Sequence, residues 1–113
     1  MNPMLDRRIP KGVQLALKEL QDYLAKVYGE RLRGVYLYGS YARGKPCSYS
    51  DIDVAVVSPD FKGKRILKRQ ELLGEAIFPL GEPIEALGYS TDELRHAHPM
   101  SFLSEILATG RVV

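Results

Sequence analysis

The chain is poor in cysteine, in long apolar runs and in net charge, and each scarcity excludes a class of protein. Cys47 is the only cysteine, so neither an intrachain disulfide nor a zinc site built on several cysteines can form. No apolar run approaches the ~18 to 20 residues of a membrane span, so a membrane is not an expected partner. The formal net charge of +2 is too small to indicate nucleic-acid binding by itself, and nucleic acid is not an expected partner either.

The length and the beginning of the chain favour a small cytoplasmic protein. Its 113 residues suit one domain spanning 1–113, because domains of this size are common. The first residues lack the apolar core of a secretion signal, which predicts a cytoplasmic location. A content of 45% hydrophobic and 27% charged residues is ordinary for a globular protein.

Apolar spacing in the first part of the chain predicts a helix and then a strand. One helical stripe, with steps of three and four, consists of Val13, Leu17, Leu20, Leu24 and Val27. Gly29 is expected to end this helix. The period then changes to two, which places Val35 and Leu37 on one face of a strand and two tyrosines on the other. A helical turn is expected over 40–43.

The rest of the chain alternates strands and helices. The expected segments are a strand over 51–57, a helix over 62–77 and a strand over 83–89. The apolar residues expected on the inner face of that helix are Ile66, Leu73 and Ile77. Ser90 and Glu93 have the spacing of a capping box that opens a short helix. A last helix is expected to begin at Pro99, to carry Leu103, Ile106 and Leu107, and to end at Gly110.

This order of elements predicts an α/β (α+β) fold in which a small mixed sheet is covered by helices.

The catalytic chemistry is expected at the start of the second strand. Asp51 and Asp53 are two residues apart, so their carboxylates point the same way, roughly 6.5 to 7 Å apart. They would repel each other, and a divalent cation between them would relieve that repulsion. Oxygen ligands beside a phosphate favour Mg²⁺ over a transition metal.

A phosphate site is expected where the first strand ends. Gly39 lets the backbone approach a ligand closely, and a helical turn after it would direct free N–H groups at a phosphate. The Ser40 hydroxyl and the Arg43 guanidinium could donate further hydrogen bonds. Phosphate donors beside paired carboxylates indicate metal-assisted transfer that involves a polyphosphate.

A third carboxylate on a neighbouring strand would complete this site. Glu85 is the best candidate because it lies early in the third strand, as the aspartates do in theirs, and shares a face with Leu87 and Tyr89. Its expected role is that of a metal ligand or of a general base on an incoming hydroxyl. The predicted catalytic and metal-binding residues are therefore Asp51, Asp53 and Glu85, and the predicted nucleotide-binding residues are Gly39, Ser40 and Arg43.

This pattern resembles the signature of the minimal nucleotidyltransferases of the DNA polymerase β superfamily. Gly39-Ser40 is followed by ten residues and then by Asp51-x-Asp53, and the ending from Phe102 to Arg111 also resembles that family. The resemblance implies a mixed α/β nucleotidyltransferase fold, Mg²⁺, and transfer of a nucleoside monophosphate from ATP or another NTP to an acceptor. One departure is the third acid, which is Glu85 here, whereas aspartate is more usual.

The resemblance also implies a protein partner. Family members of this size are often encoded beside a HEPN-domain protein, a helical RNase-like toxin, which implies an antitoxin that adds AMP to a tyrosine of the toxin. Two alternatives remain open. One is a small-molecule acceptor such as an aminoglycoside antibiotic, and the other is a non-catalytic nucleotide-binding module that neutralises its partner by contact. A homo-oligomer is also left open.

Other motifs receive structural interpretations. The residues from Gly39 to Lys45 fit the start of a P-loop, but Pro46 stands where that motif requires Ser or Thr and would break its helix. His96 and His98 are interpreted as surface loop residues rather than as a metal pair. Cys47 is interpreted as incidental rather than nucleophilic.

Two clusters of residues near these motifs have both a structural and a functional interpretation. Five positive charges between Lys62 and Arg69 are best explained as the solvated face of a helix, with an acidic partner or an RNA contact as the alternative. The tyrosines near the motif are Tyr36, Tyr38, Tyr41 and Tyr49. They are interpreted as packing residues, of which one could line a base pocket.

Overall fold

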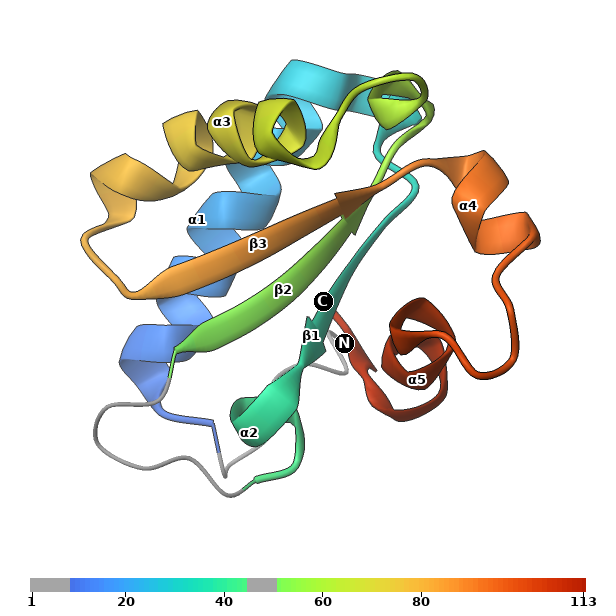
Figure 1. The fold of residues 1–113 in the computed structure, drawn as a ribbon. Helices are drawn as coiled ribbons and strands as arrows, with labels where there is room; N and C mark the ends of the chain where they lie inside the picture. The colour runs from blue at the N-terminus through green and yellow to red at the C-terminus, as the bar shows by residue number, and fades with distance from the viewer. Residues whose placement is uncertain (1–8, 45–50) are drawn as a thin grey trace.

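The computed structural model describes residues 9–44 and 51–113, which form a mixed four-stranded sheet with helices packed against it (Figure 1). The helices are α1 (Lys11–Tyr28), α2 (Gly39–Ala42), α3 (Ile66–Ile77), α4 (Thr91–Arg95) and α5 (Phe102–Thr109). The strands are β1 (Gly34–Tyr38), β2 (Ile52–Val57), β3 (Ile84–Tyr89) and β4 (Arg111–Val112). Single 3₁₀ turns lie at Gly29–Arg31, Pro59–Phe61 and Phe78–Leu80.

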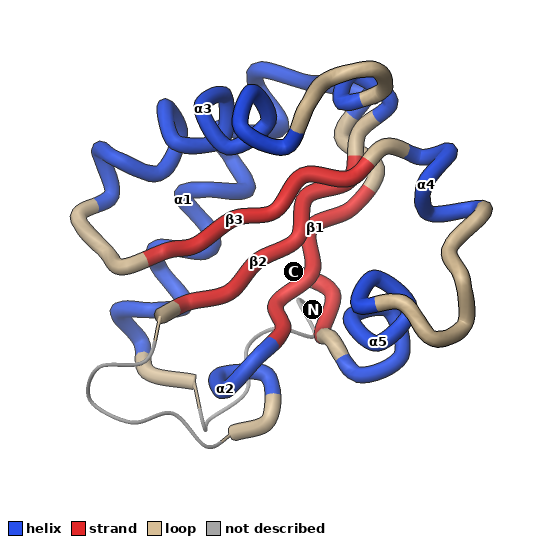
Figure 2. The backbone as a smooth tube through the Cα atoms, in the orientation of Figure 1, coloured by secondary structure: helices blue, strands red, loops and turns tan. Residues whose placement is uncertain are grey.

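The strand order is β3-β2-β1-β4, in which β2 and β3 are parallel and the other neighbours are antiparallel. The expected mixed sheet is therefore confirmed. Because β1 and β2 run in opposite directions, the end of β1 lies beside the start of β2 (Figure 2). The start of β3 lies there too, since it runs parallel to β2. This topology gathers the three predicted parts of the site at one end of the sheet.

The two faces of the sheet have different partners. Alternate residues of the strands, such as Leu37, Val54 and Ala86, form one buried apolar core with α1 and α3. Both helices lie on that side of the sheet in Figure 1. Strand periodicity directs the intervening residues to the opposite face, and α5 packs against β1 beside that face. Only this second face is free to carry polar chemistry.

Some residues expected in the helical interior are exposed. Val27 continues the stripe of α1 by spacing but is 48% exposed, and the neighbouring Tyr28 is buried instead. Ile66 is 67% exposed because it is the first residue of α3, which begins four residues later than expected. Leu73 is buried as predicted, together with Ala76. In both helices the apolar period correctly predicts the buried residues in the middle of the helix but not at one of its ends.

The last elements also differ in detail from the expectation. The capping box at Ser90 and Glu93 is confirmed, with both reciprocal hydrogen bonds present. The final helix begins at Phe102 rather than at Pro99, because the Ser101 side chain caps its N-terminus. Leu107 lies on this helix as expected and is 37% exposed. Sequence periodicity did not predict β4, which follows the helix as a two-residue edge strand.

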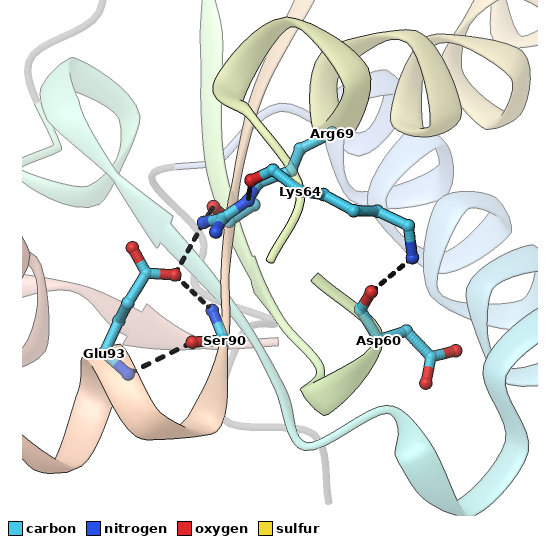
Figure 3. A network of polar contacts seen from close by, with 6 residues as sticks. Asp60, Lys64, Arg69, Ser90 and Glu93 are labelled. Atoms are coloured by element: carbon cyan, nitrogen blue, oxygen red, sulfur yellow. Dashed lines mark hydrogen bonds and ion pairs between the residues drawn. The ribbon is translucent and has the colours of Figure 1, made fainter. Parts of the chain in front are cut away.

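The basic segment from Lys62 to Arg69 is divided between solvent and internal contacts. Lys62, Arg65 and Lys68 are exposed as expected, whereas Lys64 and Arg69 make internal contacts. Arg69 is only 8% exposed and donates to the carbonyls of Lys64 and Gly88 and to the Glu93 carboxylate, at 2.6 to 2.9 Å (Figure 3). The Lys64 ammonium donates to the backbone carbonyl of Asp60. Burial opposes ionisation of Glu93, but hydrogen bonds from Ser90 and Arg69 hold its pKa below the usual range. This network joins α3, β3 and α4.

No helix in the described ranges is both long and apolar enough to cross a membrane. The predictions that concern Pro46, Cys47 and Tyr49 lie outside the residues that the structure describes.

Candidate active site

Three polar side chains form a row across the sheet at the end where β1 stops. Tyr38 of β1 is paired with Asp53 of β2, and Asp53 is paired in turn with Glu85 of β3. Residues paired in register share a face, and neighbouring strands lie about 5 Å apart. Glu85 therefore lies on the same face as Asp53, which is where the sequence prediction requires it. Asp51 is one residue before β2 and is exposed.

The electrostatics of the row centre on Asp53. Burial raises the pKa of its carboxyl group above the ordinary value, and the charges of Glu85 and Asp51 raise it further. The Arg43 guanidinium acts in the opposite direction and lowers it. The pKa of the Tyr38 phenol is also raised, first by burial and then by the charge of Asp53. The three carboxylates and Arg43 thus interact in the folded chain.

The carboxylates of Asp51, Asp53 and Glu85 suit a hard divalent cation, although they do not form a complete metal site in this structure. Within residues 9–44 and 51–113, no three His, Cys, Asp or Glu side chains are gathered closely enough to hold a metal ion. However, burial raises the pKa of Asp53 and the charges of Glu85 and Asp51 raise it further, and a bound cation would offset the repulsion between these charges. All three groups offer carboxylate oxygens, which Mg²⁺ prefers. Ligation by these three residues stays a prediction.

Gly39 is the residue that lets the chain turn directly over Asp53. Its φ angle of +76° lies in the region that favours glycine. A Cβ atom at this position would overlap the Oδ2 atom of Asp53. The start of α2 is therefore in contact with the central carboxylate of the row, as the motif requires.

Further residues lie at or beside α2, and one of them links it to the sheet. Arg43 is exposed just after α2 and close enough to influence the Asp53 carboxyl group. Arg111 of β4 donates from Nε to the carbonyl of Ala42, the last residue of α2, at 2.9 Å. Ser40 lies in the first turn of α2 and is partly buried. The expected helical turn is confirmed, and the role of Ser40 and Arg43 as phosphate donors stays a prediction.

A cleft of about 210 Å³ opens between this row and α5. One wall is formed by Tyr38, Gly39, Arg43 and Asp53, and the other by Phe102, Glu105, Ile106 and Thr109. The α5 wall was not predicted from the sequence. The available signal was the spacing of Phe102, Glu105 and Thr109, which places polar or aromatic groups on one helix face beside buried Leu103. Tyr38 of the tyrosine cluster lines this cleft, and its place in a base pocket stays a prediction.

The two histidines lie apart from this cleft. Both are exposed, and the His98 Nδ1 atom accepts a hydrogen bond from the Met100 backbone N–H at 3.0 Å. The ring of His96 lies 3.0 Å from the Asp92 carbonyl oxygen. These local contacts agree with their interpretation as surface loop residues.

A comparison with protein families identifies the family to which this chain belongs. The model of the nucleotidyltransferase domain matches residues 17–96, which include β1, α2, β2 and β3. The chain belongs to the nucleotidyltransferase domain family. It is accordingly a nucleotidyltransferase enzyme of the minimal type, as the Gly-Ser and Asp-x-Asp spacing indicated.

Two curated relatives of this nucleotidyltransferase come from Methanocaldococcus jannaschii, and each is named "putative protein adenylyltransferase". The first is 31% identical over 98 residues, which is 87% of this chain and 94% of the relative. The second is 36% identical over 56 residues, which is 47% of this chain but only 38% of the relative. The first match extends along nearly all of both chains.

The fold also has a counterpart among solved structures. A crystal structure titled as a "putative nucleotidyltransferase" from Sulfolobus solfataricus superposes with a TM-score of 0.61. The two chains are 17% identical, and the superposition covers 91% of this chain and 86% of the other. This similarity establishes a shared fold.

Proposed function

We propose that this nucleotidyltransferase moves AMP from ATP to a hydroxyl group of a protein acceptor. The observation that carries the proposal is the row of Asp53 and Glu85 beneath Gly39, because it sets carboxylates against the expected phosphate donors. The choice of a protein acceptor is supported by the name of the relative that matches nearly the whole chain.

Each site residue has a role in this reaction. Ser40 and Arg43 hold the phosphates by charge-assisted hydrogen bonds. The acceptor oxygen forms a bond to the α-phosphorus of ATP, the bond from that phosphorus to the bridging oxygen breaks, and pyrophosphate leaves. Glu85 accepts the proton of the acceptor hydroxyl as a general base. It is paired with Asp53 on the adjacent strand, which places it beside the reacting groups.

Asp51, Asp53 and Glu85 are the residues that would hold Mg²⁺. When bound, the ion supplies neutralisation of phosphate charge and orientation of the triphosphate. The residues fit this role because Glu85 and Asp51 add negative charge beside Asp53, whose pKa is raised first by burial and then by those two charges.

The partner proposed for this activity is a HEPN-domain toxin, which would make the protein an antitoxin. A tyrosine of that partner is the proposed acceptor. The physical requirement is an acceptor hydroxyl that reaches the row at the end of β1. Within that row Glu85 is exposed while Tyr38 and Asp53 are partly buried, and the neighbouring Asp51 is exposed too.

The test incubates the protein with Mg²⁺, a HEPN-domain protein and ATP labelled at the α-phosphate. The expected result is label on the partner and a mass gain of one or several AMP groups. ATP labelled at the γ-phosphate is the matched control and should leave no label, because pyrophosphate departs. Label from the γ-position would contradict the proposal by indicating a kinase. Label found only on an added aminoglycoside would replace the protein acceptor with a small molecule, and inhibition of the toxin without any label would indicate a binding module.

A further inference from the structure

Phe102 is an aromatic residue that the transfer reaction described above does not use. It is the first residue of α5, it lines the cleft and it is 52% exposed. Its ring meets the ring of Tyr38 edge to face, with centroids 5.5 Å apart and an interplanar angle of 83°. The contact holds the Phe102 ring at the mouth of the cleft and leaves part of it open to a ligand.

The cleft joins this ring to the reacting groups. Phe102 and Glu105 lie on one wall, and Arg43 and Asp53 lie on the other. The volume of about 210 Å³ is below the range of roughly 300 to 1,000 Å³ typical of complete ligand sites. It therefore suits one part of a nucleotide rather than the whole molecule.

Charge decides which part of the nucleotide fits. The Glu105 carboxylate on the α5 wall would repel a polyphosphate, whereas it can accept hydrogen bonds from base amino groups or ribose hydroxyls. Arg43 attracts the phosphates to the opposite wall. An acceptor must approach the α-phosphorus from the side away from the departing pyrophosphate. A subsite that shares one cleft with Arg43 thus favours the nucleoside over the acceptor.

We propose that the α5 wall is the nucleoside subsite, in which the base of the NTP stacks on Phe102 and Glu105 contacts the base or the ribose. Tyr38 fixes the orientation of the Phe102 ring from beneath. The inference deepens the proposed function, since it rests on an NTP as the substrate and assigns the part of the cleft that binds its base. Stacking of a base on an aromatic side chain is tolerant of base identity, so the selectivity among bases falls to Glu105.

The experiment compares two ligands in equilibrium binding with Mg²⁺ present. ATP carries a base, and inorganic tripolyphosphate does not. Phe102→Ala should weaken ATP binding by about 10-fold or more, in line with the energy of base stacking, and leave tripolyphosphate binding unchanged. Phe102→Tyr should restore the affinity for ATP. The control is Met100→Ala, which removes another apolar side chain near the start of α5 that is 87% exposed and does not line the cleft.

A spectroscopic measurement adds a signature of stacking. The fluorescence of 2-aminopurine riboside triphosphate should be quenched when it binds the wild-type protein and less quenched with Phe102→Leu, which keeps an apolar side chain without a ring. Glu105→Gln should alter the ratio of ATP to CTP affinities more than it alters tripolyphosphate affinity.

The outcomes separate this proposal from the proposed function. Equal losses of ATP and tripolyphosphate affinity in Phe102→Ala would overturn it, because the ring would then only support the cleft. An unchanged ATP affinity with a raised KM for the acceptor would overturn it in favour of an acceptor site. A wild-type protein that binds neither ligand would overturn both proposals. If ATP binds through Phe102 but no AMP is transferred, only the proposed function fails.

Discussion

Asp53 and Glu85 are direct partners in the parallel ladder between β2 and β3, so two carboxylates stand side by side on one face of the sheet. The neighbouring Asp51 adds a third negative charge, and Arg43 is the positive group that lowers the Asp53 pKa. Such an arrangement costs stability in the free protein. A positively charged ligand bound there would offset this cost, and this relation between stability and function can be measured.

The first prediction concerns stability and pH. Because the folded-state pKa of Asp53 is raised, ionisation of this group opposes folding, and the penalty is complete above that raised pKa. Asp53→Asn should therefore increase the melting temperature at neutral pH by a few degrees. The gain should vanish below the unfolded pKa of about 3.9, where the carboxyl is protonated in both states. Thermal melts across pH measure it, and a gain that grows towards acid would contradict the sign.

Mg²⁺ provides the matched control for that prediction. A ligand that binds only the folded state raises its stability. Adding Mg²⁺ should increase the melting temperature of the wild-type protein and have a smaller effect on Asp53→Asn. An equal increase in both proteins would place the ion elsewhere.

The second prediction is that the aspartate pair is essential for transfer. Asp51→Asn and Asp53→Asn each remove one charge with little change in volume, so the fold should remain, as judged by circular dichroism. Transfer of label from α-labelled ATP should be lost in both variants. Wild-type activity in either one would exclude that residue from the site.

The third prediction distinguishes the roles of Glu85. Glu85→Gln should abolish transfer but keep much of the ATP affinity, because it removes the general base while Asp51 and Asp53 would still hold the Mg²⁺ that binds the triphosphate. Glu85→Asp should retain some activity. Glu82→Gln is the control, since Glu82 is an exposed residue before β3 and outside its ladder. Transfer by Glu85→Gln at the rate of Glu82→Gln would remove Glu85 from the mechanism.

The fourth prediction concerns Ser40. Its hydroxyl is expected to donate to a phosphate, and a hydrogen bond to a charged group contributes about 1.5 to 3 kcal/mol. Ser40→Ala should therefore raise the Kd for ATP by about 10-fold or more, with little change in melting temperature. Calorimetric titration measures the affinity. An unchanged Kd would leave Ser40 as a turn residue only.

The fifth prediction tests the network around Arg69. Arg69→Leu removes donors to the Lys64 and Gly88 carbonyls and to the Glu93 carboxylate. Because Glu93 is 44% exposed and can be rehydrated, the expected loss of stability is about 2 to 3 kcal/mol, below that of a fully buried pair. Lys68→Ala is the control and should be nearly neutral, since its ion pair with Glu71 is exposed. Chemical denaturation measures both, and similar losses would contradict the assignment.

The sequence predicted the centre of the molecule well because local periodicity and long-range topology agree there. Strand parity places Asp53 and Glu85 on one face, and the β2–β3 register then makes them neighbours. The positive φ of Gly39 and its contact with Asp53 follow from the same motif that the spacing indicated.

Other features depend on tertiary contacts that no local pattern contains. Arg69 is buried although its neighbours in the sequence are basic, because acceptors on β3 and α4 meet it in the fold. The two residues of β4 are too few for a period, and they form a strand only because β1 offers a free edge. The wall formed by Phe102 and Glu105 became visible only once α5 was placed beside Tyr38.

The contact between Gly39 and Asp53 also determines how a descendant of this protein could lose its activity over evolutionary time. While Asp53 remains, mutation of Gly39 faces two barriers, a collision with the carboxylate and a φ of +76°. Drift of position 53 to a smaller residue would remove the first barrier but not the second. Position 39 would then accept asparagine before other side chains, since asparagine tolerates positive φ best. An asparagine at this position would mark lineages in which position 53 changed first.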